Sequence, residues 1–174
     1  MSENTESDSG KDRRVVRNKR AILTAMVELL GQKRWVEIRV NDIVDRADVG
    51  RSTFYKHFSS KDDVLLASMR PMLRILAQRG GDLSWRADLD RLLVHFWSSR
   101  SLARAVFGGE RASVVERALR DEAFVGLSGA NSVAARQMIA IRIAAGRIAL
   151  IREWAKGEFS AKPQMVADAI TDCK

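Results

Sequence analysis

The sequence predicts an all-α protein, and three observations support this fold class. Apolar residues recur three and four positions apart along the chain, which is the spacing of one face of a helix. The 174 residues include only two prolines and eleven glycines, so the chain lacks the frequent turns that a β fold needs. Hydrophobic residues make up 46% of the chain, which is enough to build a core.

Three helices are predicted in the first third of the chain, over residues 13–32, 40–47 and 51–58. The apolar spacing of the first two is carried by Ile22, Ala25, Met26 and Leu29, and then by Val40, Ile43, Val44 and Ala47. Residues 48–50 interrupt the pattern between the second and third helices. Two short helices joined by such a turn form the helix-turn-helix pattern.

A fourth helix is predicted to begin at Ser60, because Asp63 follows three positions later and an apolar run comes behind it. This helix continues through Leu76, and Pro71 is expected to kink it. The later helices are predicted at 86–98, 100–107, 111–122, 131–156 and 162–172. The segment 131–156 is apolar on more than one side, so we expect a second subunit to cover part of it.

Charge divides the chain into three predicted parts, within a formal net charge of +8. Residues 1–12 carry a net charge of −3 and are expected to form a disordered polar tail. Residues 13–61 hold twelve Lys and Arg against five Asp and Glu, which is the footprint of a module that binds a polyanion. A merely solvated basic face is the alternative. Residues 62–174 are predicted to form a helical regulatory and dimerisation domain.

The composition also excludes several classes of protein. No apolar run approaches the ~18 residues that cross a bilayer, and the polar N-terminus is not expected to be a signal peptide. The single cysteine, Cys173, allows no disulfide within the chain and favours a cytoplasmic location. With two histidines and no motif for a metal, a nucleophile or a phosphate loop, we expect no enzyme, no metal and no cofactor.

The predicted third helix has an outer face that suits contact with DNA. Phe54 and Phe58 lie four residues apart and can anchor the helix inward. The residues left for the outer face are Arg51, Ser52, Thr53, Tyr55, Lys56 and His57. Such side chains can reach base edges and phosphates when a helix lies in the major groove. The alternative is a polar helix that faces only solvent, but an exposed tyrosine among basic residues favours a DNA-binding domain over 13–61.

Residues 22–67 resemble the tetracycline-repressor (TetR) family of bacterial transcription regulators. The resemblance is carried, in order, by Ile22, Leu23, Ala25, Glu28, Leu29, Trp35, Val40, Asp42, Ile43, Arg46, Ala47, Val49, the run from Ser52 to Phe58, Ser60, Lys61, Asp62, Leu65 and Leu66. It covers under a third of the chain, but the order and spacing of these positions are specific.

The resemblance implies an all-helical homodimer that represses transcription. Each subunit would place its third helix in the major groove of one half of a palindromic operator. The C-terminal domain would bind a small-molecule effector that releases the DNA, and its last two helices would form the dimer interface. By position, Arg51, Ser52, Thr53, Tyr55 and His57 match the DNA-contacting face, with Lys56 beside them. Lys61 matches a phosphate contact, and Arg13, Arg14 and Arg17 would form a basic arm near the backbone or minor groove.

The chain departs from the family pattern at three places. Ile38 and Arg39 replace a pair of hydroxyl residues before the second helix, and Arg39 adds a charge where a phosphate could lie. Arg34 stands where the family has a glycine. In the turn, Asp48 must either adopt a left-handed backbone or shift the turn, and Gly50 becomes the N-cap of the third helix.

The C-terminal half has no motif, but some of its residues could line an effector pocket. These candidates are His95, Phe96, Trp97, Arg104, Phe107, Met138 and Arg142. Aromatic residues and methionines at helical spacing more often form plain core, and a filled core would indicate a DNA-binding protein without an effector. Arg142 lies between two isoleucines and is expected to be buried against an ion-pair partner, a dimer partner or an acidic ligand. Membrane binding through the basic first helix is disfavoured because the core needs its apolar stripe.

Overall fold

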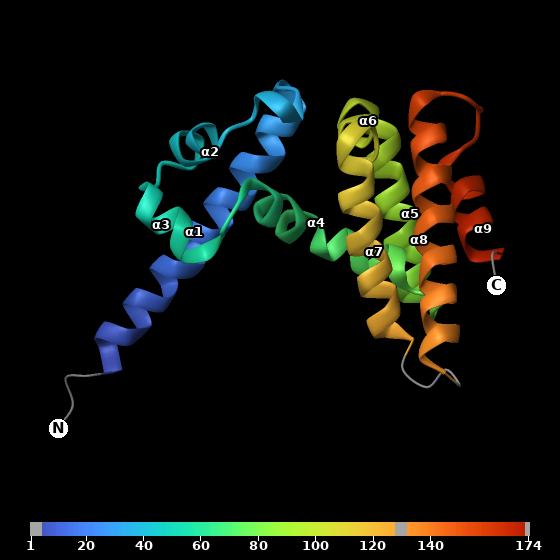
Figure 1. Cartoon of the computed structure of the whole chain (residues 1–174), viewed down its shortest axis with the longest axis horizontal. Helices are drawn as coiled ribbons and strands as arrows, with labels where there is room; N and C mark the ends of the chain where they lie inside the picture. The colour runs from blue at the N-terminus through green and yellow to red at the C-terminus, as the bar shows by residue number, and fades with distance from the viewer. Residues whose placement is uncertain (1–4, 128–131, 173–174) are drawn as a thin grey trace. The chain divides into compact units, whose positions relative to one another are not determined.

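The computed structural model describes residues 5–127 and 132–172, and every regular element in this part of the chain is a helix (Figure 1). The predicted all-α fold is therefore confirmed. The chain divides into two compact units, residues 1–68 and 69–174. α4 (Lys61–Ala77) runs through the boundary between them.

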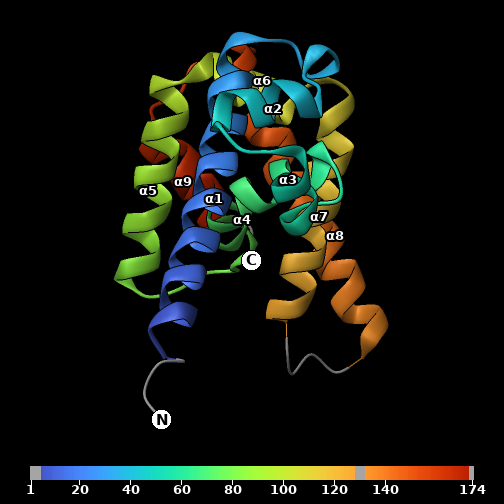
Figure 2. The same ribbon diagram turned by 90° about the vertical axis from the view of Figure 1, so that its left-hand side faces the viewer.

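The N-terminal unit is built around α1 (Thr5–Gln32). A short 3-10 turn, η1 (Trp35–Glu37), leads to α2 (Val40–Ala47) and α3 (Arg51–His57), and both of these helices contact α1. They lie beside its C-terminal half, and its N-terminal half extends beyond them (Figures 1 and 2). The core that joins these helices includes the fully buried side chains of Ile22, Met26, Ile38, Ile43 and Phe54.

α1 is longer than the sequence predicts. It begins at Thr5 rather than at residue 13, so residues 5–12 of the expected disordered tail are helical, and residues 1–4 lie outside the described part of the chain. An apolar stripe locates only the part of a helix that packs against a core. It gives no signal where a helix continues past its packing partners, as α1 does here.

The predicted cap at the start of α4 is confirmed. The backbone N–H of Asp63 donates to Ser60 Oγ at 3.1 Å, and the Asp63 carboxylate accepts the backbone N–H of Ser59 at 2.9 Å. Hydrogen bonds from the Ser59 hydroxyl and backbone lower the pKa of Asp63 below its ordinary value. Such bonds satisfy donors that the first turn of a helix leaves unpaired. Pro71 lies inside α4, which continues past it to Ala77.

The C-terminal unit adds five helices after α4. They are α5 (Leu83–Ser98), α6 (Arg100–Phe107), α7 (Ala112–Gly126), α8 (Val133–Lys156) and α9 (Pro163–Asp172), with a 3-10 turn η2 (Gly109–Arg111) before α7. α8 packs against α6 and α7, and α5 packs against α9 (Figure 1). These helices match the predicted ones within a few residues. Cys173 lies outside the described residues.

Side-chain caps explain two of the small differences in helix bounds. The Asp82 carboxylate accepts the backbone N–H of Trp85 at 3.0 Å, so α5 starts at Leu83 rather than at residue 86. The Ser132 hydroxyl accepts the backbone N–H of Ala135 at 3.0 Å and fixes the start of α8 at Val133. In both cases a residue with a short oxygen-bearing side chain satisfies a donor of the first turn.

Candidate nucleic-acid interface

The turn between α2 and α3 keeps the two helices close together. Asp48 adopts a left-handed backbone with φ 51° and ψ 51°, which is the first of the two conformations considered for it. The backbone N–H of Val49 then donates to the carbonyl of Val44 at 3.1 Å. Gly50 is the N-cap of α3, as predicted, with φ −73° and ψ 152°. The turn is therefore not shifted by the aspartate.

α3 has one buried face and one open face. Phe54 is fully buried and Phe58 nearly so, with their ring centroids 6.0 Å apart. The predicted contact residues lie on the rest of the helix: Arg51, Ser52, Tyr55 and Lys56 are exposed, and Thr53 and His57 are half-buried. Tyr55 is 58% exposed, although its ring packs edge-on against Phe54. A large aromatic residue left open beside basic residues suits a surface that meets a partner.

Arg39 stands at the N-terminus of α2 with its guanidinium exposed. Its backbone N–H donates to Asp42 Oδ2 at 2.7 Å, and Lys33 Nζ donates to Asp42 Oδ1 at 2.7 Å. The hydrogen bond from Lys33, helped by that from Arg39, lowers the pKa of Asp42. Asp42 thus binds the backbone of the N-cap residue Arg39 and the ammonium of Lys33. The Arg39 charge adds to the positive end of the helix dipole, which favours an anion there.

Lys61 has a structural role that the sequence did not reveal. Its ammonium donates to the carbonyl of Trp35 at 3.0 Å and to that of Ile38 at 2.8 Å. It also lies 4.4 Å from the centroid of the Trp35 ring. An ammonium has three donors, so two are already used within the domain. A substitution at Lys61 would therefore remove packing as well as a charge, and its predicted phosphate contact stays a prediction.

Two residues of α1 hold α2 in a way that sequence reasoning missed. Arg46 of α2 donates to Glu28 Oε2 at 3.1 Å and to Gln32 Oε1 at 2.8 Å. Glu28 and Gln32 lie four residues apart and therefore on one face of α1.

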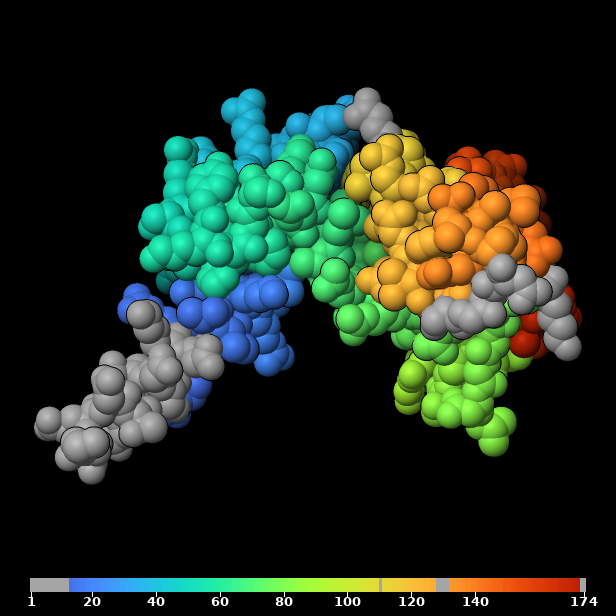
Figure 3. Space-filling model, turned by 60° about the horizontal axis from the view of Figure 1, so that its bottom comes forward, coloured from blue at the N-terminus to red at the C-terminus, as the bar shows by residue number. Residues whose placement is uncertain are grey.

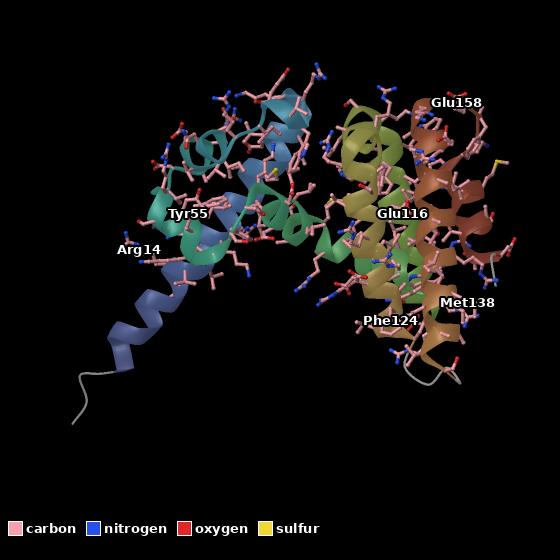
Figure 4. The ribbon with its side chains drawn as sticks, in the orientation of Figure 1. Arg14, Tyr55, Glu116, Phe124, Met138 and Glu158 are labelled. Carbon is pink, nitrogen blue, oxygen red and sulfur yellow. The ribbon has the colours of Figure 1, made fainter. Side chains whose placement is uncertain are left out.

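Nearer the N-terminus of the same helix, Arg13, Arg14 and Arg17 are exposed. Figure 4 shows Arg14 and Tyr55 at the same edge of the N-terminal unit.

The predicted effector residues differ in how deeply they are buried in the C-terminal unit. Phe96 and Phe107 are buried and pack edge to face, with centroids 5.2 Å apart, so they belong to the core. Trp97 is partly exposed and stacks on Trp154. The other candidates, His95, Arg104, Met138 and Arg142, are exposed.

Arg142 is exposed in the single chain, and the arginine of the same helix that is buried there is Arg147. Only 4% of Arg147 is exposed, and its guanidinium donates to the carbonyl of Gln78 at 2.6 Å and to that of Leu76. These carbonyls lie at the C-terminal end of α4, where helix carbonyls lack partners within the helix. A cation there also suits the negative end of the helix dipole. Arg147 thus ties α8 to the end of α4.

The described residues of the C-terminal unit line hollows large enough for a small ligand. One, of about 430 Å³, is lined by the end of α4 and the end of α7, and its lining includes Arg74, Gln78, Glu122 and Leu127. Another, of about 420 Å³, lies between α8 and α9 and includes Arg142, Gly146, Leu150 and Ala169. Of the predicted effector residues, Arg142 lines the second hollow and none lines the first.

The described residues contain no group of three or more His, Cys, Asp or Glu side chains that could hold a metal ion. Within the same residues, no helix is both long and apolar enough to cross a membrane.

Comparison with known proteins finds similarity to bacterial transcription regulators. Residues 22–68 match the family model of bacterial regulatory proteins, tetR family. The chain is 39% identical over 66 residues to the HTH-type transcriptional regulator EthR of Mycolicibacterium smegmatis, covering 38% of this chain and 28% of that protein. It is 30% identical over 121 residues to EthR of Mycobacterium tuberculosis, covering 63% of this chain and 54% of that protein. The chain therefore spans less than two thirds of the length of these relatives.

A solved structure has the same fold over nearly the whole chain. The TetR transcriptional regulator from Streptococcus agalactiae 2603V superposes with a TM-score of 0.61 at 21% identity, covering 94% of this chain and 97% of that one. At this level of identity the likeness concerns the fold.

Proposed function

This chain belongs to the tetR family of bacterial transcription regulators, and from that premise we propose that it is a repressor. It binds a palindromic operator as a homodimer, with α3 of each subunit in the major groove of one half-site. A small-molecule effector releases it from the DNA. The observation that carries this proposal is the outer face of α3, where Arg51, Ser52, Tyr55 and Lys56 are exposed above the buried Phe54.

The chemistry of this face supports sequence-specific binding. A helix that presents hydroxyl, guanidinium and ammonium groups can donate to base edges and to phosphates from one position. Arg39 at the start of α2 adds a cation at the positive end of a helix dipole, where a phosphate binds readily. Residues 13–61 carry a net charge of +7, which supports salt-sensitive attraction to the duplex.

Exposed apolar residues on α8 and α9 support a homodimer through these last two helices. Met138 is 66% exposed, Ile141 is 51% exposed, and Met165 of α9 is open as well. The hollow beside Gly146 offers space for side chains from a second copy. Side chains of α8 lie at the surface in Figure 3. Apolar surface of this kind marks an interface more often than a solvated face.

The hollow of about 430 Å³ between α4 and α7 has room for a small ligand. Successive major grooves on one side of a duplex are ~34 Å apart. An effector that shifts the balance between two dimer conformations would change the distance between the two copies of α3, so that they no longer match this spacing. The alternative is a DNA-binding protein without an effector. The packed Phe96 and Phe107 rings favour it, because two of the residues expected to line a pocket belong to the core instead.

The test of DNA recognition is a fluorescence anisotropy titration with duplexes from the DNA that flanks the gene of this protein. Tyr55→Ala should weaken operator binding about tenfold or more, roughly 1–3 kcal/mol, because it removes a contact within the groove. The unfolding midpoint should change little, since Tyr55 is mostly exposed. Val94→Ala in α5 removes another exposed apolar side chain and should leave operator binding unchanged.

Equal affinity of the wild-type protein for operator and random duplexes at physiological salt would refute sequence-specific regulation. Repeating the titration with candidate small molecules separates the two forms of the proposal. Release of the operator by one of these molecules supports an effector. Operator binding that none of them changes supports the effector-independent form.

A further inference from the structure

The hollow between α4 and α7 is built from one face at the end of each helix. Arg74 and Ala77 lie three residues apart on α4, so their side chains are on the same side of it. Glu122 and Gly126 lie four residues apart on α7 and share a side in the same way. Arg79, just beyond the end of α4, lines the hollow as well. The volume of about 430 Å³ is in the range of small-molecule sites.

Part of the lining of this hollow is apolar. Ala123 belongs to a buried hydrophobic cluster that includes residues of α8, and Ala77 and Leu127 pack against that cluster. Val125, which also lines the hollow, is 71% exposed. A ligand that covered these side chains would remove apolar surface from water. The hollow therefore favours a ligand with an apolar body.

Two arginines of α8 hold the ends of α4 and α7 on which the hollow is built. Arg147 donates to the carbonyls of Leu76 and Gln78 at the end of α4. Arg136 donates to the carbonyl of Phe124 at 3.0 Å, and its guanidinium lies 4.2 Å from the centroid of the Phe124 ring. Figure 4 labels Phe124 near the end of α7. A site whose walls are already held loses less conformational entropy when a ligand binds.

The two arginines that line the hollow itself are placed differently. Arg74 and Arg79 are exposed, and within the described part of the chain neither side chain has a hydrogen bond or an ion pair. The carboxylate of Glu122 lies 3.6 Å from Arg70, which is outside the lining, so its charge is already balanced. A cation in the last turn of α4 could offset the helix dipole, but Arg147 already occupies carbonyls there. The hollow thus offers two positive charges to a ligand.

We propose that this hollow binds a small carboxylate with an apolar body, such as an aromatic or branched aliphatic acid, and that this compound is the effector. The inference rests on the proposed function and names the chemical class of its effector. A guanidinium pairs with a carboxylate through two parallel hydrogen bonds, and Arg74 and Arg79 supply two such groups beside the apolar lining.

The rest of the lining disfavours more polar ligands. Apart from the two arginines and the balanced Glu122, the described side chains that line the hollow offer only the Gln78 amide for hydrogen bonding. A sugar or a nucleotide would leave several of its polar groups without partners against the alanine, valine and leucine side chains, and each such group is costly to bury. A ligand with one charged group and an apolar remainder avoids that cost.

The experiment measures binding of small acids to the full chain by isothermal titration calorimetry. The probes are benzoate, cinnamate and isovalerate, each compared with its neutral primary amide, which has nearly the same shape. At least one of the acids should bind, and it should bind about tenfold or more tightly than its amide, because the amide cannot form the charged pair with a guanidinium.

Arg74→Gln and Arg79→Gln should each weaken binding of that acid about tenfold and leave binding of its amide unchanged. Both side chains are exposed, so the unfolding midpoint should not change. Arg117→Gln is the matched control, because Arg117 is an exposed arginine of α7 that does not line the hollow. It should leave binding of the acid unchanged.

Gly126→Leu tests the position of the site without altering its charge. A Cβ at Gly126 would meet no atom within 4 Å, so the added side chain has open space in the hollow that Gly126 lines. The variant should bind neither the acid nor its amide. Leucine suits a helix better than glycine, so α7 should be retained, which circular dichroism checks.

The same acid should release the wild-type protein from its operator in the anisotropy titration, at concentrations close to its dissociation constant. The double variant of Arg74→Gln and Arg79→Gln should need about tenfold more acid for release, or still higher concentrations.

Three outcomes would overturn the inference while the wild-type protein still prefers its operator. The acids bind no more tightly than their amides or not at all, the double variant binds the acid with wild-type affinity, or the bound acid does not release the operator. A wild-type protein without preference for its operator would refute the proposed function instead. Calorimetry needs no DNA, so it would still decide whether the hollow binds an acid.

Discussion

Asp48 shows how one residue can keep the geometry of a motif while departing from its usual sequence. Its φ of 51° lies in the left-handed region, and among the described residues it is the one non-glycine with positive φ. Aspartate tolerates this region better than most residues with a Cβ. The helix-turn-helix therefore keeps the conformation of its turn. The aspartate at this position is expected to lower the stability of the domain without changing its structure.

Asp48→Ala should lower the free energy of unfolding by about 1 kcal/mol, because alanine in a left-handed conformation is strained and has no compensating polar side chain. Asp48→Asn should be close to neutral, because asparagine also populates this region. Urea denaturation followed by circular dichroism measures both changes. An alanine variant as stable as the wild type would mean that the turn relaxes to another conformation.

Single residues also differ in how well the sequence predicts their burial and contacts. The two faces of α3 followed from the spacing of Phe54 and Phe58, because a short helix over one core has a single buried side. On α8 nothing in the sequence marks Arg147 as the arginine that is buried within the chain, where Arg142 is exposed. A helix that is apolar on several sides does not reveal which side meets the core. Lys61 was missed as a structural residue because its carbonyl partners lie more than twenty positions away.

At the scale of elements, α4 is the helix that links the two units, and it contains a proline. Pro71 has no N–H to donate to the carbonyl of Ala67 one turn earlier. The start of α4 was predicted closely, because the cap at Ser60 was recognised in the sequence. The caps at Asp82 and Ser132 were not recognised, so α5 and α8 begin at Leu83 and Val133 rather than at residues 86 and 131. The N-terminal extension of α1 was not predicted, because it has neither a packing partner nor an apolar stripe to mark it.

Pro71→Ala should raise the free energy of unfolding by roughly 1–3 kcal/mol, because alanine restores a backbone hydrogen bond and suits a helix interior. Pro163→Ala provides the control. Pro163 is the first residue of α9, where a missing N–H has no helical acceptor to satisfy, so its replacement should have little effect. Thermal and urea denaturation of both variants would settle the comparison. A stability gain at Pro163 equal to that at Pro71 would contradict this account of α4.

At the scale of the whole molecule, we expect the apolar residues left open on α8 to form the proposed dimer interface. Ile141→Glu places a charge on the proposed interface and should shift the protein from dimer to monomer in sedimentation or light-scattering measurements. Operator affinity should fall with it, because a monomer reaches only one half-site. Leu83→Glu adds the same charge at an exposed apolar residue of α5 and should change neither property. A wild-type protein that binds its operator as a monomer would refute the proposed interface.

The four indole side chains are divided unevenly between the two units. Trp35, beneath the Lys61 ammonium, is alone in residues 1–68. In residues 69–174, Trp97 and Trp154 stack with ring centroids 5.3 Å apart, close enough for their excited states to couple. A lone emitter and a coupled pair differ in fluorescence and near-ultraviolet dichroism. Unlabelled protein therefore offers separate optical signals from the unit that carries α3 and the unit that carries α8.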